Sequence, residues 1–320
     1  MYPMKLTAAL KDYLWGGTKL KTEYNKKSDL EKVAESWELS CHKDGPSTVA
    51  NGEFAGMTLP QVIEKQGKEI LGSDCQHFED FPILIKLIDA KDNLSVQVHP
   101  DNDYARRVEG EYGKTEMWYI VDCEEGASLL YGFKNEISTE EFKRRIQDNT
   151  LLDVVNSVPV KKGDMFFIDA GTLHAIGKGI LIAEIQQNSN TTYRIYDFGR
   201  VGADGKPREL HVDKAIDVTK LAPPTRDTKP QGEPQQMDGY VSTLLSTCEY
   251  FTVHVLDIAS KAELDVDEKS FHSLLCLEGE VTLASSHGDM ELAKGDSVFL
   301  QANYGSYTLT GAGKVVLTTV

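Results

Sequence analysis

Long apolar runs, paired cysteines and basic clusters are all scarce in this chain of 320 residues. No stretch approaches the ~18 apolar residues that a membrane-spanning helix needs. The first ten residues carry no apolar segment of the secretory kind. We therefore expect a cytoplasmic protein with no membrane partner.

The cysteines are five in number, lie far apart and form no CxxC pair. Such spacing does not fit a disulfide framework, so we interpret them as reduced thiols in or near the core. A catalytic Cys–His pair is the alternative, although no activating neighbourhood is visible around any of them. The residues are Cys41, Cys75, Cys123, Cys248 and Cys276.

Positive charge is in deficit, with 34 Lys and Arg against 50 Asp and Glu, for a net charge of −16. Nucleic acids and anionic membranes bind clustered basic residues, so neither is expected as a partner. A small anionic substrate stays compatible with this balance, because a site that holds a metal can be locally positive. The sequence carries no indication of oligomeric state.

Proline concentrates in residues 221–236, which contain four of the eleven prolines and almost no apolar side chains. This composition predicts a linker or a long covering loop. It divides the chain into residues 1–220 and residues 237–320.

Helix signals are few. Capping boxes predict short helices after Ser28, Thr58 and Ser138, and a fourth is expected over 210–220. Short segments rich in Val, Ile, Phe and Tyr fill much of the rest, which favours a β-barrel or sandwich over βαβ units. Before the linker the expected strands are 81–87, 94–98, 117–121, 127–133, 165–168 and 180–186. After it they are 251–258, 273–277, 280–284, 290–293, 297–300, 306–310 and 314–319.

A weak internal echo links the two parts of the chain. The segment 162–168, Lys-Gly-Asp-Met-Phe-Phe-Ile, resembles 294–300, Lys-Gly-Asp-Ser-Val-Phe-Leu. In the first part His174 follows the echoed strand, whereas no histidine follows it in the second. We infer two related barrels, of which the second lacks the ligand.

Alternating polar residues precede the first of two histidines of interest. Ser95, Gln97 and His99 alternate with Leu94, Val96 and Val98, so on a strand the polar set shares one face. Glu116 opens the next strand and His174 follows a turn. Two imidazoles, a carboxylate and an amide oxygen suit Zn²⁺ with an open position. The alternative is that His99 and His174 are unrelated histidines at the end of a barrel.

Several segments resemble type I mannose-6-phosphate isomerase in its short bacterial form, a member of the cupin superfamily. They are 15–20 (Trp-Gly-Gly-Thr-Lys-Leu), 35–38 (Glu-Ser-Trp-Glu), 95–101 with 114–118, 171–175 (Gly-Thr-Leu-His-Ala) and 184–194. The resemblance implies a mainly β fold of two cupin-type (jelly-roll) barrels with a few short helices. Residues 1–220 would form the catalytic metal-binding domain with helical additions, and 237–320 a degenerate cupin-like barrel without ligands.

The resemblance also implies one Zn²⁺ per chain, bound by Gln97, His99, Glu116 and His174. It implies an aldose–ketose isomerase that interconverts mannose 6-phosphate and fructose 6-phosphate through a cis-enediol intermediate.

Four further residues are implied at this site. Arg194 matches the family's active-site arginine; since it is permanently charged, we assign it to enediolate stabilisation or phosphate binding rather than to base catalysis. Lys114 is assigned to proton transfer and substrate binding, with a solvated turn lysine as the alternative. Ser95 and Glu184 are placed with the substrate-binding residues.

Two departures from the family pattern stand out, Asp169 in place of a proline and the amide-rich run 186–190. Two other functions remain open at this stage. A non-catalytic sugar-phosphate-binding cupin would bind without turnover, and a metal-dependent cupin oxygenase would consume oxygen. Gln97 disfavours the oxygenase, because the usual facial triad has two histidines and one carboxylate.

Overall fold

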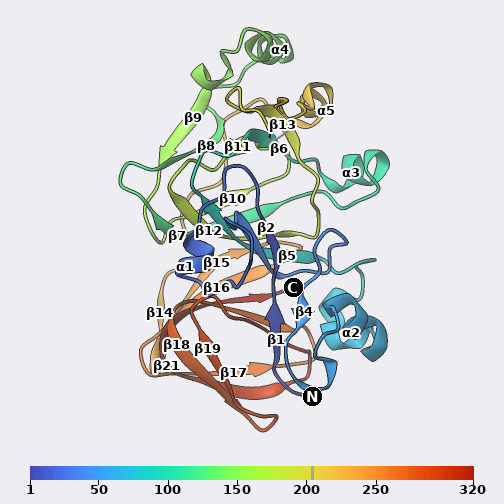
Figure 1. Cartoon of the computed structure of the whole chain (residues 1–320), viewed down its shortest axis with the longest axis vertical. Coiled ribbons are helices and arrows are strands. Elements are labelled where there is room, and N and C mark those ends of the chain that lie inside the picture. The colour runs from blue at the N-terminus through green and yellow to red at the C-terminus, as the bar shows by residue number, and fades with distance from the viewer. Residues whose placement is uncertain (203–204) are drawn as a thin grey trace.

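The structure is a computed structural model that describes residues 1–202 and 205–320. It is mainly β, with two barrel-like bodies stacked along the long axis of the molecule (Figure 1). The α-helices are α1 (Lys19–Thr22), α2 (Leu59–Gln66), α3 (Asn102–Val108), α4 (Thr139–Gln147) and α5 (Val212–Val218), and short 3₁₀ turns lie at Gly52–Phe54, Lys68–Leu71, Ser73–Cys75 and Leu151–Asp153. No helix of the described residues is long and apolar enough to cross a membrane.

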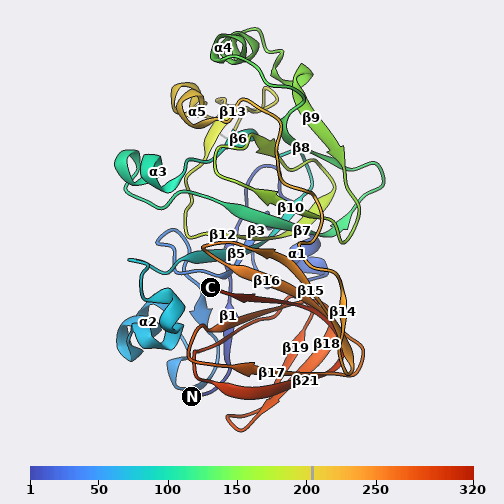
Figure 2. The ribbon, with the colours of Figure 1, turned by 180° about the vertical axis from the view of Figure 1, so that it is seen from behind.

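The first barrel is built from two facing sheets, with α4 and α5 at its outer end and α3 at its side (Figures 1 and 2). The six-stranded sheet has the order β10-β7-β12-β5-β3-β2, and the five-stranded sheet has the order β13-β6-β11-β8-β9. Their strands are β2 (Ala9–Lys11), β3 (Glu35–Leu39), β5 (Ile83–Ala90), β6 (Val96–Val98), β7 (Glu116–Cys123), β8 (Ser128–Phe133), β9 (Val155–Pro159), β10 (Met165–Ile168), β11 (His174–Ala175), β12 (Ile180–Gln187) and β13 (Tyr193–Tyr196).

The second barrel is one strongly curved antiparallel sheet with the order β14-β15-β16-β21-β18-β20-β1-β4. Two further strands join it, because β17 pairs with β21 and β19 with β18. Its strands are β1 (Met4–Thr7), β4 (Thr48–Val49), β14 (Gln235–Gln236), β15 (Tyr240–Thr247), β16 (Thr252–Ile258), β17 (Lys261–Val266), β18 (His272–Ser285), β19 (Met290–Ala293), β20 (Ser297–Leu300) and β21 (Gly305–Thr319).

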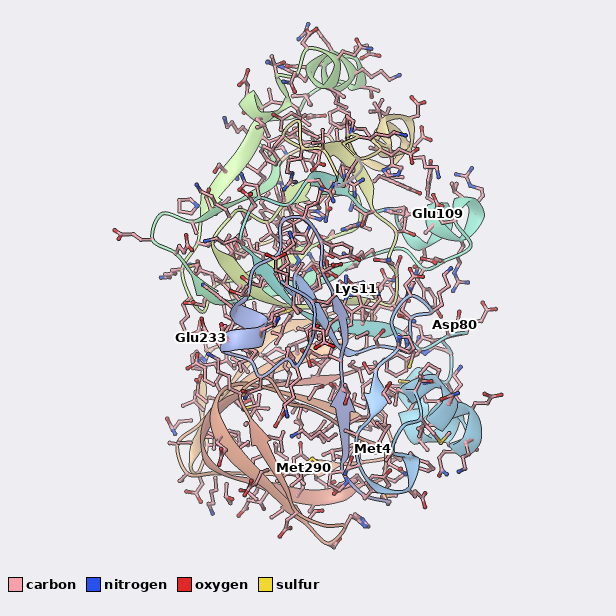
Figure 3. All side chains as sticks on the ribbon, in the orientation of Figure 1. Met4, Lys11, Asp80, Glu109, Glu233 and Met290 are labelled. Atoms are coloured by element: carbon pink, nitrogen blue, oxygen red, sulfur yellow. The ribbon has the colours of Figure 1, made fainter. Side chains whose placement is uncertain are left out.

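The N-terminal strand belongs to this second barrel. Met4 on β1 pairs with Phe299 on β20 and lies against the lower body in Figure 3. Lys5 Nζ lies 2.7 Å from a carboxylate oxygen of Asp296. The assignment of 1–220 and 237–320 to separate domains stays a prediction, and strands from the beginning of the chain complete the C-terminal sheet.

The six-stranded sheet is buried on both faces, which explains its nearly continuous apolar strands. On β7, Met117 and Tyr119 join a core cluster that includes Phe251 and Phe299 of the second barrel. Trp118, between them on the strand, points the opposite way into the first barrel. One sheet therefore carries the contact between the barrels on one face and the interior of the first barrel on the other.

The echo between the two parts is a shared turn. Gly163 and Gly295 have φ of +91° and +93°, a left-handed conformation that glycine adopts readily. Each glycine N–H donates to a strand carbonyl at 2.8 Å, from Ile120 in one barrel and Cys276 in the other. The inference of two related barrels is confirmed by this geometry and by the pairing of β10 with β7 and of β20 with β18.

The Pro-rich segment 221–236 follows the outside of the molecule from one barrel to the other. Arg226 forms an ion pair with Asp169 at 3.1 Å, and its guanidinium lies 4.4 Å from the centroid of the Phe167 ring. The segment then joins the second barrel at β14. Asp169, which departs from the family pattern, thus fixes this segment beside the turn that precedes His174.

Three of the four predicted helices are confirmed, as α2, α4 and α5, and the Thr58–Gln61 capping box is present. The helix predicted after Ser28 is wrong. Ser28 Oγ accepts the N–H of Leu30, two residues on, and Val33 forms a bridge with Gly17. A serine that bonds so locally favours a turn over a helix.

Truncation of Phe251 tests whether the two barrels share one core. The side chain is fully buried, and its ring lies 6.2 Å from that of Phe167 on β10. We expect Phe251→Ala to lower the free energy of unfolding by about 3–5 kcal/mol in urea titrations, with one transition reported by probes in both barrels. The exposed Leu210→Ala is the control. Two separate transitions in the native protein would show that the barrels unfold independently.

Candidate metal centre

Three potential ligands converge inside the first barrel. Glu116 Oε2 lies 3.7 Å from His99 Nε2, and Glu116 Oε1 lies 3.5 Å from His174 Nε2. The three side chains are at most 1% exposed. One atom of each lies within 4.8 Å of the others, so a single ion could contact all three.

The fold brings these residues together from opposite sheets. His174 on β11 pairs directly with Gln97 on β6, while Glu116 begins β7 in the facing sheet. The turn before His174 is fixed by Gly171, whose N–H donates to the His99 carbonyl at 2.8 Å. Gly171 has φ of +87°, and a Cβ there would lie 2.8 Å from the Val218 carbonyl oxygen. This position therefore requires glycine.

Backbone carbonyls orient both imidazoles. His99 Nδ1 lies 2.9 Å from the Thr191 carbonyl oxygen, and His174 Nδ1 lies 2.8 Å from that of Thr172. Each Nδ1 therefore carries the proton, which leaves each Nε2 lone pair facing the centre. Burial lowers the pKa of His99 well below its ordinary value and that of His174 to about 4. Both rings are neutral near pH 7, as metal ligands must be.

Glu116 is short of hydrogen bonds. Neither of its oxygens accepts one of good geometry, although Lys114 Nζ lies 2.5 Å from Oε2. Burial, and secondarily the charge of Glu184, raises the pKa of Glu116 to about 7. A buried carboxylate with an unused oxygen is the arrangement that a cation would relieve.

Gln97 lies beside the group but presents the other end of its amide. Its Nε2 lies 3.4 Å from His174 Nε2, while its Oε1 lies 3.4 Å from Ser95 Oγ. As a ligand it would have to turn its terminal amide by half a turn, since only the oxygen coordinates a metal. The other three residues fit a metal as they stand.

A cavity of about 270 Å³ opens beside these residues. All the residues assigned to substrate from the sequence line it, namely Ser95, Lys114, Glu184 and Arg194. Arg194 Nε lies 3.3 Å from Ser95 Oγ, so these two meet at one part of the wall. Lys114 is not a solvated turn lysine, because it is only 4% exposed.

Glu184 lies within an ionic network in this cavity. It accepts a hydrogen bond from Trp118 Nε1 at 2.9 Å and lies 3.5 Å from the ammonium groups of both Lys114 and Lys86. Burial alone would raise the pKa of Glu184, but the two lysines outweigh it, so its pKa is lowered. The side chain is therefore a carboxylate near neutral pH.

Three charged residues of the cavity, Lys86, Glu35 and Arg208, were not among the residues predicted from the sequence. Lys86 is 4% exposed and pairs with Glu184 and with Glu35, whose Oε2 lies 3.5 Å away. Burial would lower the pKa of Lys86, but Glu35 and Glu184 outweigh it and raise it. A lysine inside Ile-Leu-Ile-Lys-Leu-Ile was the available signal. Arg208 also lines the cavity, held by two bonds to Asp197 at 2.6 and 2.8 Å.

A larger cavity, of about 640 Å³, shares no lining residue with this one. Cys41 and His42 contribute to its wall. Burial raises the pKa of the Cys41 thiol well above its ordinary value, so it is not an activated nucleophile. All five cysteines are free thiols.

The fold and this ligand arrangement define a cupin protein with a candidate metal centre. A family model of the phosphomannose isomerase type I catalytic domain matches residues 4–126, and a model of the mannose-6-phosphate isomerase cupin domain matches residues 241–320.

Curated relatives extend the match to the whole chain. Mannose-6-phosphate isomerase ManA of Bacillus subtilis is 36% identical, with 98% of both chains covered. The mannose-6-phosphate isomerase of Streptococcus mutans is also 36% identical, with 98% of this chain and 97% of the relative covered. A crystal structure of the Bacillus subtilis mannose 6-phosphate isomerase superposes with a TM-score of 0.93 at 35% identity over 100% of both chains. The chain belongs to the type I phosphomannose isomerase family, as its sequence segments predicted.

Proton release on metal binding tests the protonation of Glu116. Since its pKa is about 7, the carboxyl holds a proton below that pH that an incoming cation must displace. We expect Zn²⁺ binding to release about one proton at pH 6, and progressively fewer as the pH rises through 7 to 8. The neutral histidines contribute none there.

Calorimetric titration with Zn²⁺ in buffers of different ionisation enthalpy measures this number. Glu116→Gln, which keeps an oxygen ligand but has no titrating proton, is the matched control. Undiminished release from this variant would assign the proton to another group.

Proposed function

We propose that this chain is a zinc-dependent isomerase that interconverts mannose 6-phosphate and fructose 6-phosphate through a cis-enediol intermediate. The observation that carries the proposal is the convergence of His99, Glu116 and His174 beside a cavity that Arg194 and Lys114 line. Lys114 joins the two, because its Nζ contacts both Glu116 and His99. The names of the curated relatives support the substrate. Free thiols throughout the chain fit a cytoplasmic enzyme.

The ligand atoms favour zinc over a hard cation. Two neutral imidazole nitrogens and one carboxylate form a borderline set, and Gln97 would add an amide oxygen as the fourth ligand. When bound there, Zn²⁺ supplies a Lewis acid that polarises the sugar carbonyl and stabilises negative charge on the neighbouring oxygen.

Lys114 is the side chain best placed to move a proton. Its Nζ lies 2.5 Å from Glu116 Oε2, 3.2 Å from His99 Nε2 and 3.5 Å from Glu184 Oε1. It thus joins the ligand group to the carboxylate of Glu184. Isomerisation moves protons between neighbouring carbon and oxygen atoms, and we assign this shuttling to Lys114, with Glu184 as its ionic partner.

The cavity also presents two guanidinium groups to an anionic substrate. Arg194 and Arg208 both line the cavity, and Ser95 offers a hydroxyl beside Arg194. The guanidinium of Arg208 is oriented by Asp197. Burial would raise the pKa of Asp197, but hydrogen bonds from Arg208 and Arg200 outweigh burial and lower it. Guanidinium groups bind phosphate oxygens with charge-assisted hydrogen bonds, so we assign the phosphate to Arg208. We assign Arg194, which pairs with Gln97 across β13 and β6, to the enediolate.

Metal removal tests the proposed activity. Chelator-treated protein should lose conversion of mannose 6-phosphate to fructose 6-phosphate, and Zn²⁺ should restore it, as followed by a coupled assay with elemental analysis of the protein. Saturable binding of mannose 6-phosphate without turnover by the zinc-loaded protein would instead indicate a non-catalytic cupin. Substrate-dependent oxygen uptake with Fe²⁺ would indicate an oxygenase.

Substitution of the two cavity arginines separates binding from chemistry. Arg208→Ala should raise KM about 10- to 100-fold with little change in kcat, because it removes a charged contact made equally before and during reaction. Arg194→Ala should lower kcat as well, since we assign it to the enediolate. Arg200→Ala is the control: Arg200 also bonds Asp197 but does not line the cavity. An unchanged KM in Arg208→Ala would contradict the phosphate assignment.

A further inference from the structure

One residue of the amide-rich run 186–190, Gln187, forms hydrogen bonds to the backbone next to the candidate ligand Glu116. Gln187 on β12 is 2% exposed and lies opposite Thr115, the residue between Lys114 and Glu116. Its backbone N–H donates to the Thr115 carbonyl at 3.0 Å, and its side-chain Oε1 accepts the Thr115 N–H at 2.9 Å. Gln187 therefore binds both backbone groups of the residue that precedes the ligand.

Asn102 holds the other end of the Gln187 amide. Gln187 Nε2 donates to Asn102 Oδ1 at 2.9 Å, and the same oxygen accepts the Gly113 N–H at 2.9 Å. The loop packs closely against Asn102, because a Cβ on Gly113 would lie 2.5 Å from the backbone nitrogen of Asn102. The approach to Glu116 is thus fixed at two backbone N–H groups, those of Gly113 and Thr115, by two side-chain amides.

The second barrel supplies the last member of this chain. Asn102 Nδ2 donates to Tyr250 Oη at 3.0 Å. Tyr250 lies in the turn between β15 and β16, where the Cys248 N–H donates to the Phe251 carbonyl, and it packs against the core cluster common to both barrels. In the side-chain amides of Asn102 and Gln187, each oxygen accepts a hydrogen bond and each nitrogen donates one. These bonds link Tyr250 to Thr115 and leave one N–H hydrogen of each amide without a bond in this set.

We propose that Tyr250, Asn102 and Gln187 are positioning residues through which the second barrel fixes Lys114 and Glu116 at the metal centre. These hydrogen bonds are partly buried and restrict the groups they join, because a shifted partner would lose its bond. Movement of the 113–115 loop would displace both Lys114 and Glu116, whose head groups lie 2.5 Å apart. The second barrel, which we expect to bind no metal, would thus contribute to the site from outside.

Zinc affinity is the main readout, and it does not require turnover. Tyr250→Phe removes only the hydroxyl, and we expect it to weaken Zn²⁺ binding about tenfold in competition with a fluorescent chelator. Asn102→Leu should have at least as large an effect. The double variant should be no worse than Asn102→Leu alone, because both changes break the same path.

Asn102→Asp is the conservative rescue. A carboxylate still accepts from Gly113 and Gln187, and the Tyr250 hydroxyl can become the donor to it, since burial and then Glu249 raise the pKa of Tyr250 to about 12 and keep it protonated. Its Zn²⁺ affinity should lie within a factor of about three of the native value. Tyr307→Phe is the matched control, because it removes a hydroxyl bonded to His272 in the same barrel, remote from the ligands.

The activity readout rests on the proposed function, and there we expect kcat of Tyr250→Phe to fall with KM little changed. The inference would be overturned if Tyr250→Phe and Tyr307→Phe bound Zn²⁺ with equal affinity while their melting temperatures fell by similar amounts. Failure of Asn102→Asp to recover affinity would also overturn it. Native protein that binds Zn²⁺ but does not isomerise mannose 6-phosphate would refute the proposed function, while the affinity comparison would still decide this inference.

Discussion

Charge pairing inside the first barrel is the constraint on which the rest of the structure depends. Two lysines and three glutamates are at most 8% exposed there: Lys86, Lys114, Glu35, Glu116 and Glu184. With neutral histidines and all three glutamates ionised, as Glu116 must be when it binds a cation, they carry a net charge of −1, so one divalent cation would bring the site to +1. A buried site with that charge would stabilise an anion such as the proposed enediolate. The same groups would be strongly destabilising if any one of them lost its partner.

The six-stranded sheet holds these charged side chains in place because both of its faces are packed against other parts of the protein. Its inner face carries the charges, and its outer face packs on the second barrel through residues such as Tyr119 and Phe299. Side chains held by a close-packed sheet lose little further entropy when substrate binds, which is how a preformed site gains catalytic power. The shared core thus serves stability and positioning together.

Much of this arrangement follows from local sequence, and what does not follow is long-range. The period-two pattern predicts that Leu94, Val96 and Val98 share the face away from the interior, and Val96 and Val98 do pack with Phe142 of α4 and Ala215 of α5. Leu94, before β6 begins, instead joins the interior cluster and lines the cavity. The sequence made His99, Glu116 and His174 candidate ligands, and each lies at the end of a recognisable strand or turn. Lys86 was missed because an isolated charge in an apolar strand has meaning only once Glu35 and Glu184 are known to face it. The helix expected after Ser28 failed because side-chain bonding there satisfies a turn, and the membership of β1 in the C-terminal sheet depends on a pairing across almost the whole chain.

In the second barrel a different polar residue stands at the position that corresponds to the candidate ligand Glu116. Leu300 pairs with His272 on β18 in the same register in which Ile168 pairs with Glu116 on β7, so His272 occupies the position of a ligand. Its Nδ1 lies 2.9 Å from the hydroxyl of Tyr307, and burial lowers its pKa to about 4. A neutral imidazole that bonds a tyrosine hydroxyl on β21 needs no cation. A polar side chain therefore lies at the same position of both barrels. In the second barrel a hydrogen bond to Tyr307 satisfies it, whereas in the first barrel Glu116 keeps an oxygen without a hydrogen-bond partner.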